Sequence, residues 1–162
     1  NESECDEIEF SAPLHDIGKI GTPDRILLKP GKFEPDEWEI MKQHTTIGHS
    51  ILSNSQSPYM KTGSIIALNH HEKFDGTGYP NGLSGQNIPL VARIVSVADV
   101  YDALVSKRPY KQPWSNADAL DHIQKQSGTQ FDPTCVAAFF ERLDNIHAIQ
   151  KEFSDYDETI HH

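Results

Sequence analysis

Cysteine is scarce in this 162-residue chain, and the scarcity excludes two kinds of small protein. The two cysteines, Cys5 and Cys135, lie far apart and follow neither a disulfide nor a metal-ligand spacing. A disulfide framework and a structural zinc knuckle are therefore both excluded as interpretations. The same pattern favours a reducing compartment, so we expect a cytoplasmic location.

Long apolar runs and excess positive charge are also missing. The longest apolar stretch, IPLVARIVSVADV, is interrupted by charge and too short to span a bilayer, so we expect no membrane segment. The net charge of -10 argues against binding of nucleic acid polymers, because non-specific affinity requires many phosphate-neutralising Lys and Arg side chains. Eleven of the 14 basic residues lie at or before Lys111, in the part of the chain that also holds His15, His44, His70 and His71. This concentration of positive charge suits a small anionic ligand, although ordinary surface charge is the alternative.

The hydrophobic pattern predicts helices and no strands. Helical periodicity and helix start or stop signals cover residues 36–53, 62–73, 89–106, 115–128 and 132–150. Residues 89–106 are apolar on nearly every face, so we predict that they form the central buried helix. Nothing alternates convincingly with a period of two, and we predict an all-α fold.

The size of the chain indicates one domain. At 18.2 kDa, with 36% apolar residues, the chain can bury a single hydrophobic core. We expect that domain to occupy residues 1–153. Residues 154–162 form an acidic C-terminal tail, which we expect to be a solvated end.

Histidine is abundant, with nine residues, and several of them stand close to aspartates in the sequence. The candidate metal ligands are His15, Asp16, His44, His70, His71 and Asp99. Histidine with aspartate is a nitrogen and oxygen ligand set that suits iron, manganese or zinc. Neighbouring histidines project about 100° apart on a helix, so His70 and His71 suit a site with several ions, or one ligand and one supporting group.

Each candidate also has an alternative interpretation. A histidine pair at the end of a helix is commonly a partner of the helix dipole or a surface feature. His44 alone is more typical of a satisfied core or surface residue. Asp99 lies in the apolar helix and needs a partner, which could be a metal ion or a salt bridge to Arg93 or Arg108.

Several motifs taken together resemble one family. They are LHDIGKIGTPDRILLKPGKF, MKQHTTIGHSIL, NHHEKFDGTGYPNGLSGQNIPLVARIVSVADVYDALVSKRPYK and GTQFDP. In this order, from about residue 11 to residue 133, they are similar to the HD-GYP family of cyclic di-GMP phosphodiesterases, a branch of the HD superfamily of metal-dependent phosphohydrolases. The resemblance implies an HD-type helical bundle around a polynuclear metal site.

The resemblance also implies a role for each matching position. The implied metal ligands are the six candidates given above, with Asp16 bridging two ions. Asp16 and Lys19 would be catalytic, and Lys19 would contact the scissile phosphate. The implied substrate-binding residues are Lys19, Tyr79, Asp102, Arg108 and Lys111.

The expected activity is metal-dependent hydrolysis of cyclic di-GMP to linear pGpG, which many members of the family cleave further to GMP. The implied cofactor is two or three divalent metal ions, iron or manganese first, with zinc, nickel or magnesium as alternatives. Implied partners are an upstream receiver or sensor domain and diguanylate cyclases of the GGDEF type, docked through Gly78-Tyr79-Pro80. Two alternatives stay open: an impaired sensor or protein-docking module, and a hydrolase of another cyclic dinucleotide such as cyclic GMP-AMP.

The chain departs from the family pattern at one point. The resemblance implies a further histidine ligand on a helix upstream of His15, but residues 1–14, NESECDEIEFSAPL, contain no histidine. We therefore expect the domain to lack its N-terminal helix, with a loss of metal affinity.

Overall fold

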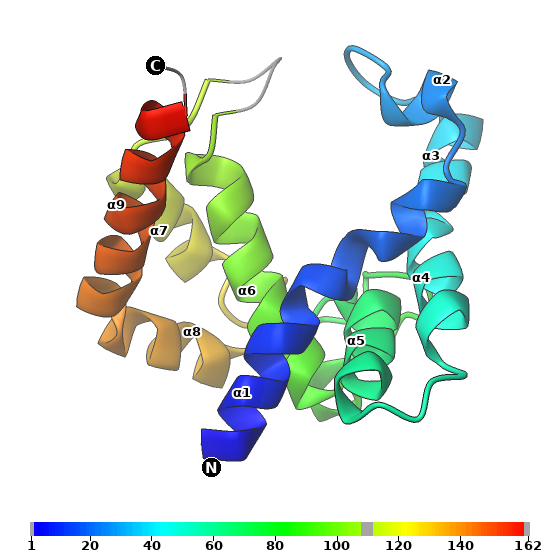
Figure 1. Ribbon diagram of the computed structural model, residues 1–162, viewed down its shortest axis with the longest axis horizontal. Helices are drawn as coiled ribbons and strands as arrows, with labels where there is room; N and C mark the ends of the chain where they lie inside the picture. The colour runs from blue at the N-terminus through cyan, green and yellow to red at the C-terminus, as the bar shows by residue number, and fades with distance from the viewer. Residues whose placement is uncertain (1, 108–111, 161–162) are drawn as a thin grey trace.

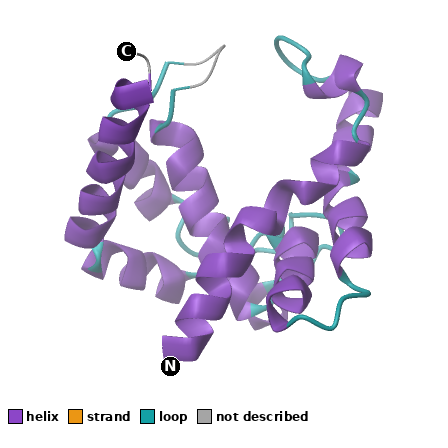
Figure 2. Cartoon of the chain, in the orientation of Figure 1, coloured by secondary structure: helices purple, strands orange, loops and turns teal. Residues whose placement is uncertain are grey.

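The computed structural model describes residues 2–107 and 112–160, with side chains as far as residue 153, and every regular element in those ranges is helical (Figure 2). In chain order the elements are α1 (Glu2–Ser11), η1 (Ala12–Gly21), α2 (Asp24–Leu27), α3 (Pro35–Lys42), α4 (His44–Leu52), α5 (Pro58–Asn69), η2 (Gly85–Asn87), α6 (Leu90–Val105), α7 (Asn116–Lys125), α8 (Pro133–Glu141) and α9 (Leu143–Ile160), where η marks a 3₁₀-helix. The predicted all-α fold is confirmed. In these ranges no helix has both the length and the apolar character needed to cross a bilayer.

Helix α6 lies in the middle of the molecule, between two groups of helices (Figure 1). On one side it contacts α5, which packs with α4, η1 and α1. On the other side it contacts α7 and α8. The core between α6, α7 and α8 consists of Val97, Tyr101, Leu104, Ala119, Ile123, Phe131 and Val136. The central position predicted for residues 89–106 is therefore correct.

Two predicted helices are each broken in two. The helix expected over residues 36–53 is interrupted at Gln43, between α3 and α4. At this break the Thr45 and Thr46 hydroxyls donate to the carbonyls of Lys42 and Gln43, both at 2.9 Å. Side chains that bond to the backbone three residues earlier compete with helical hydrogen bonds, which periodicity alone does not reveal.

The second break lies at Arg142, whose φ of -116° and ψ of 18° depart from helical values and separate α8 from α9. Helix α9 then continues to Ile160. Its backbone therefore includes residues 154–160, most of the segment expected to be a solvated end. The proposed domain boundary at residue 153 stays a prediction.

The residues before the His15 motif form α1, which the sequence analysis did not predict. Most residues of α1 are exposed, and several of them are acidic. The helix therefore shows little of the apolar periodicity by which a helix is predicted from sequence. It is held to α5 by hydrogen bonds from Ser11 Oγ to the Tyr59 carbonyl, at 2.9 Å, and from Thr62 Oγ1 to Glu7. It adds no histidine, and the expectation that the domain lacks its N-terminal helix stays a prediction.

Candidate metal centre

Four elements bring the candidate ligands together. The η1 helix carries His15 and Asp16, α4 begins with His44, and His70 and His71 follow the last residue of α5. Asp99 lies on α6 and completes the group.

Close backbone packing sets the distance between η1 and α4. A Cβ atom added at Gly18 would lie 1.9 Å from the carbonyl oxygen of His44 and 2.4 Å from the amide nitrogen of Gly48. Only glycine permits this approach. It places Asp16, two residues before Gly18, directly against the first residue of α4.

Asp16 is the centre of the cluster. Its Oδ2 atom lies 3.4 Å from His15 Nε2, and its Oδ1 atom lies 3.5 Å from His44 Nε2 and 3.8 Å from His70 Nε2. Asp99 Oδ1 lies 3.4 Å from the same His15 nitrogen. The ligand atoms of Asp16, His44, His70 and His71 all lie within 4.8 Å of one another. One carboxylate therefore reaches three imidazoles, which suits a bridging ligand.

Backbone carbonyls fix which nitrogen of each ring faces the cluster. His15 Nδ1 donates to the Ala12 carbonyl at 2.8 Å, and His44 Nδ1 donates to Met41 at 2.7 Å. His70 Nδ1 lies 3.1 Å from the carbonyls of both Ile66 and Ala67. Because Nδ1 carries the proton, Nε2 of the neutral ring has its lone pair directed inward, as in histidine metal ligands.

The polar atoms that face the centre lack partners, which tests whether the residues fit a metal ion. Asp16 Oδ1, His44 Nε2 and His70 Nε2 are buried and make no hydrogen bond. Buried polar atoms are costly unless they are hydrogen-bonded or coordinate an ion. Three such atoms converging on one point are the donor set of a divalent cation, so the residues present fit a metal.

The electrostatics of the site agree with this assignment. Burial lowers the pKa of His44, lowers that of His70 to about 4 and lowers that of His71 to about 3, so these three rings are neutral at pH 7. At His15 burial acts in the same direction, but hydrogen bonds to the two aspartates prevail and raise the pKa to about 10. The two carboxylates therefore favour a positive charge beside His15 Nε2: without metal this charge is a proton on Nε2, and a bound ion would take its place.

The pKa values of Asp16 and Asp99 are both lowered, although burial alone would raise them. Burial raises the pKa of Asp16, but His15 and Lys19 outweigh it and hold that pKa far below its usual range. The pKa of Asp99 is lowered by His15 against the same effect of burial. Both carboxylates are ionised at neutral pH, the form that binds metal.

Asp99 also decides between two interpretations of the sequence. Arg93, one of the arginines considered as its partner, bonds to Asp132 instead. The salt bridge from Asp99 to Arg93 is therefore wrong, and Asp99 contacts the histidine cluster. The other arginine considered, Arg108, lies outside the described residues.

The remaining predicted site residues fall in three places. Lys19 Nζ lies 2.5 Å from Asp16 Oδ2, at the edge of the cluster and partly exposed. The Tyr79 ring stacks on that of His71, with ring centroids 4.8 Å apart. Arg108 and Lys111 lie outside the described residues, so their expected contact with substrate stays a prediction.

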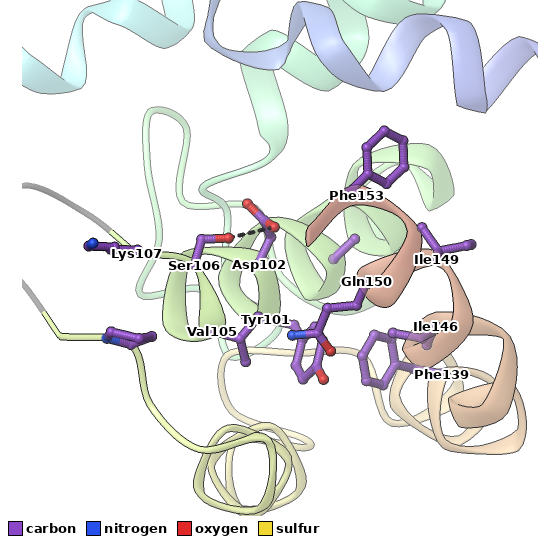
Figure 3. A pocket seen from close by; sticks show the side chains of 12 residues that line it. Tyr101, Asp102, Val105, Ser106, Lys107, Phe139, Ile146, Ile149, Gln150 and Phe153 are labelled. Atoms are coloured by element: carbon purple, nitrogen blue, oxygen red, sulfur yellow. Dashed lines mark hydrogen bonds between the residues drawn. The ribbon is translucent and has the colours of Figure 1, made fainter. Parts of the chain in front are cut away.

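Asp102 is not part of the cluster. It lines a separate cavity of about 620 Å³ and accepts a hydrogen bond from Ser106 Oγ at 3.0 Å (Figure 3). Phe139 and Phe153 form apolar parts of the same wall. Asp102 lies three residues after Asp99 on α6, but Asp99 contacts His15 whereas Asp102 faces this cavity.

A cleft of about 430 Å³ adjoins the cluster, and sequence reasoning missed most of its lining. Beside His70, His71 and Tyr79 it is lined by Trp38, Lys42 and Glu72, among others. Trp38 lies on α3 and contacts Tyr79 edge to face, with ring centroids 5.7 Å apart. Glu72 is 3% exposed, although a glutamate after two histidines in the sequence has no signal that separates it from surface charge.

The chain is similar in sequence to an HD domain and to several proteins that are named as phosphodiesterases. A sequence model described as HD domain matches residues 1–135. The response regulator RpfG of Xanthomonas campestris pv. campestris, named as a cyclic di-GMP phosphodiesterase, is 51% identical over 154 residues, 95% of this chain and 41% of its own length. A protein of Thermotoga maritima with the same named activity is 54% identical over 93% of this chain and 41% of its own.

Relatives named for another nucleotide also match. The 3′3′-cGAMP-specific phosphodiesterase 2 of Vibrio cholerae is 45% identical over 95% of this chain and 30% of its own length. The crystal structure of a cyclic GMP-AMP specific phosphodiesterase of V. cholerae shares the fold, with a TM-score of 0.66 at 21% identity, over 90% of this chain and 39% of that one. The chain spans about two fifths of the length of RpfG and of the T. maritima protein.

Proposed function

Because the chain belongs to the HD domain family, we propose that it is a metal-dependent phosphodiesterase that hydrolyses cyclic di-GMP to linear pGpG and then to GMP. The relatives named as cyclic di-GMP phosphodiesterases are consistent with the HD-GYP branch that the motifs resemble. The family predicted from the sequence is therefore confirmed. The reaction and its products are the proposal.

The observation that carries this proposal is the convergence of buried, unpaired ligand atoms on Asp16. The Oδ1 atom of this carboxylate faces Nε2 atoms of His44 and His70 that have no other partner. A structural ion pair would satisfy these atoms within the protein, whereas a metal site leaves them for the ion. Divalent ions bound there supply Lewis-acid polarisation of a phosphoryl oxygen and activation of water.

The chain itself contributes positioning and charge. His15, Asp16, His44, His70, His71 and Asp99 would hold the ions. Lys19 stands 2.5 Å from Asp16 at the open edge of the cluster, where its ammonium group can stabilise negative charge that develops on the phosphoryl oxygens. The phenol of Tyr79 stays neutral because burial raises its pKa, so Tyr79 acts as a wall of the cleft rather than as a base.

Three further residues are proposed to bind the substrate. Arg108 and Lys111 are proposed to grip its phosphates, a task for which the planar guanidinium of arginine suits bidentate contacts. Asp102, in the cavity beside α6, is proposed to contact a base, because a carboxylate accepts hydrogen bonds from the N–H groups of guanine.

The finer expectations belong to the same proposal. Iron or manganese would fill two or three sites, with zinc, nickel or magnesium as alternatives, since the ligand set accepts all of these ions. The protein would act in the cytoplasm, downstream of a receiver or sensor domain, and would dock GGDEF-type cyclases through the loop at Gly78-Tyr79-Pro80. The name of RpfG as a response regulator supports the receiver.

One second candidate has a specific observation in its favour. Two relatives named as 3′3′-cGAMP-specific phosphodiesterases match 95% and 82% of the chain, so cyclic GMP-AMP is the alternative substrate. The two substrates share the phosphodiester chemistry and differ at one base.

The test is a hydrolysis assay on the metal-free chain reloaded with manganese or ferrous iron under anaerobic conditions. Cyclic di-GMP and 3′3′-cGAMP are supplied in parallel, and products are identified by chromatography and mass spectrometry. We expect pGpG from cyclic di-GMP, with no product in the Asp16→Asn variant. If the folded, metal-loaded chain binds cyclic di-GMP but releases no product, the proposed hydrolysis is refuted and a sensor function is favoured. Product from 3′3′-cGAMP alone would establish the second candidate.

A further inference from the structure

His71 is held differently from the other histidines of the metal centre. His15, His44 and His70 each anchor Nδ1 on a backbone carbonyl. In the part of the chain that the structure describes, the His71 ring has no such hydrogen bond. It lies instead against the Tyr79 ring, with centroids 4.8 Å apart and planes 27° apart. An aromatic contact thus stands where the other three rings have a carbonyl.

The position of Tyr79 depends on a loop that folds back over the residues of the histidine pair. The Tyr79 amide donates to the His71 carbonyl at 3.2 Å. A Cβ atom added at Gly78 would lie 2.5 Å from Glu72 Cα and 2.3 Å from the Lys73 amide nitrogen. The loop therefore has no space to shift toward the pair, but this packing alone does not prevent it from moving away.

Glu72 holds the loop from the inside. Its side chain is almost completely buried. Its Oε1 atom accepts a hydrogen bond from the Asn81 amide at 2.7 Å, and its Oε2 atom accepts one from the Leu83 amide at 3.0 Å. Both carboxylate oxygens are committed to the backbone just after Tyr79, and hydrogen bonds to a charged acceptor are the stronger kind.

We propose that Glu72 is a positioning residue of the metal centre: by binding the amides of Asn81 and Leu83, it keeps the Tyr79 ring against His71 and the His71 ring directed at the cluster. Outer partners of metal ligands orient the ring, and their loss typically lowers metal affinity by about 10- to 100-fold. Glu72 acts here through a loop and an aromatic ring rather than by a direct hydrogen bond. The proposal depends on the proposed function only for the identity of the substrate.

The first experiment compares Glu72→Ala and Glu72→Gln with a control that is destabilised elsewhere. Val136→Ala removes two buried methyl groups of α8 from the core between α6, α7 and α8, away from the cluster. Manganese affinity is measured by calorimetry, stability by thermal unfolding, and kcat and KM by hydrolysis. We expect Glu72→Ala to weaken manganese binding about tenfold or more and to lower kcat more than it raises KM.

The two comparison variants make the result specific. Glutamine keeps one carbonyl acceptor and turns an amide group toward the other donor, so Glu72→Gln should recover part of the affinity. Val136→Ala should lower the melting temperature and leave manganese affinity unchanged. If Glu72→Ala lowers only the melting temperature, as Val136→Ala does, Glu72 is a structural residue of the loop and the proposal is overturned.

A double-mutant cycle tests whether the effect passes through Tyr79. Tyr79→Ala alone should weaken manganese binding by a similar factor. The double variant Glu72→Ala with Tyr79→Ala should be no weaker than the worse single variant, because both changes remove the same contact with His71. Additive losses would overturn the proposed route. Manganese affinity is read without substrate, so failure of the wild-type chain to hydrolyse cyclic di-GMP would refute the proposed function and leave this result intact.

Discussion

Gly18→Ala is the smallest change that should disrupt the metal centre, because it adds one methyl group between two backbones. The new Cβ atom would lie 1.9 Å from the His44 carbonyl oxygen, about 1.5 Å inside the 3.4 Å at which ordinary contact begins. Neither η1 nor α4 has a side chain at this contact that could rotate away. The two helices must therefore move apart, and this movement carries Asp16 away from His44.

The expected magnitude follows from the geometry of the contact. Overpacking of a side chain typically costs about 1–3 kcal/mol, and a contact between backbones lies at or above that range. For a domain of this size, about 3 kcal/mol corresponds to a fall of roughly 6–12 °C in melting temperature. Displacing Asp16 Oδ1, now 3.5 Å from His44 Nε2, should also lower manganese affinity about tenfold or more.

Gly21→Ala is the matched control in the same 3₁₀-helix. Its added Cβ atom would meet only the side chain of Ile47, at 2.9 Å from Cδ1, which is the flexible end of that side chain. Thermal unfolding and manganese calorimetry on both variants should therefore show a large loss for Gly18→Ala and a small one for Gly21→Ala. Wild-type stability and affinity in Gly18→Ala would refute the account of how η1 is set against α4.

Three further changes test other parts of the structure. Asp16→Asn should bind less than one manganese ion per chain by plasma mass spectrometry, because its carboxylate faces three imidazoles; full metal content would show that Asp16 does not bridge. The pKa of Asp132 is lowered despite burial, by the Thr134 amide and Arg93, so its contribution to stability is present above the unfolded value of about 3.9 and is lost as pH falls below it. In urea unfolding from pH 6 to pH 2.5, the stability difference between wild type and Asp132→Asn should shrink, and a constant difference would contradict this. Burial raises the pKa of the Cys135 thiol to about 11, so iodoacetamide at pH 7.5 should modify exposed Cys5 first by mass spectrometry, and equal rates would refute the assignment.

Helix ends with a local chemical signal were predictable from the sequence. Ser115 was expected to cap a helix, and its hydroxyl accepts a hydrogen bond from the Asp118 amide at 3.1 Å. Asp132 was expected at the start of the next helix, and it caps α8 through the Thr134 amide at 2.8 Å. The breaks at Gln43 and Arg142 were not predictable in this way, because hydrophobic periodicity continues through them.

The ligand residues could be predicted by type, but their convergence could not. Histidine beside aspartate indicated a metal site, and the family resemblance supplied the grouping of His15 with Asp99, which are 84 positions apart. No spacing in the sequence indicates that Gly18 lets two helices touch, although this contact sets the distance between Asp16 and His44. Glu72 was missed for the same reason, since its burial arises from a loop that folds back on it.

The side chains of the cluster are placed by contacts with the fold, and three of their inward-facing atoms have no partner within the described part of the protein. Leaving a buried polar atom without a partner typically costs about 1–3 kcal/mol, and the cluster holds three such atoms on Asp16, His44 and His70. The rings cannot relieve this cost by rotating, because His44 and His70 are tied through Nδ1 to carbonyls of their own helices. A divalent ion held by these residues would supply the partners that the three atoms lack, and the packing of η1, α4 and α5 places those residues around it.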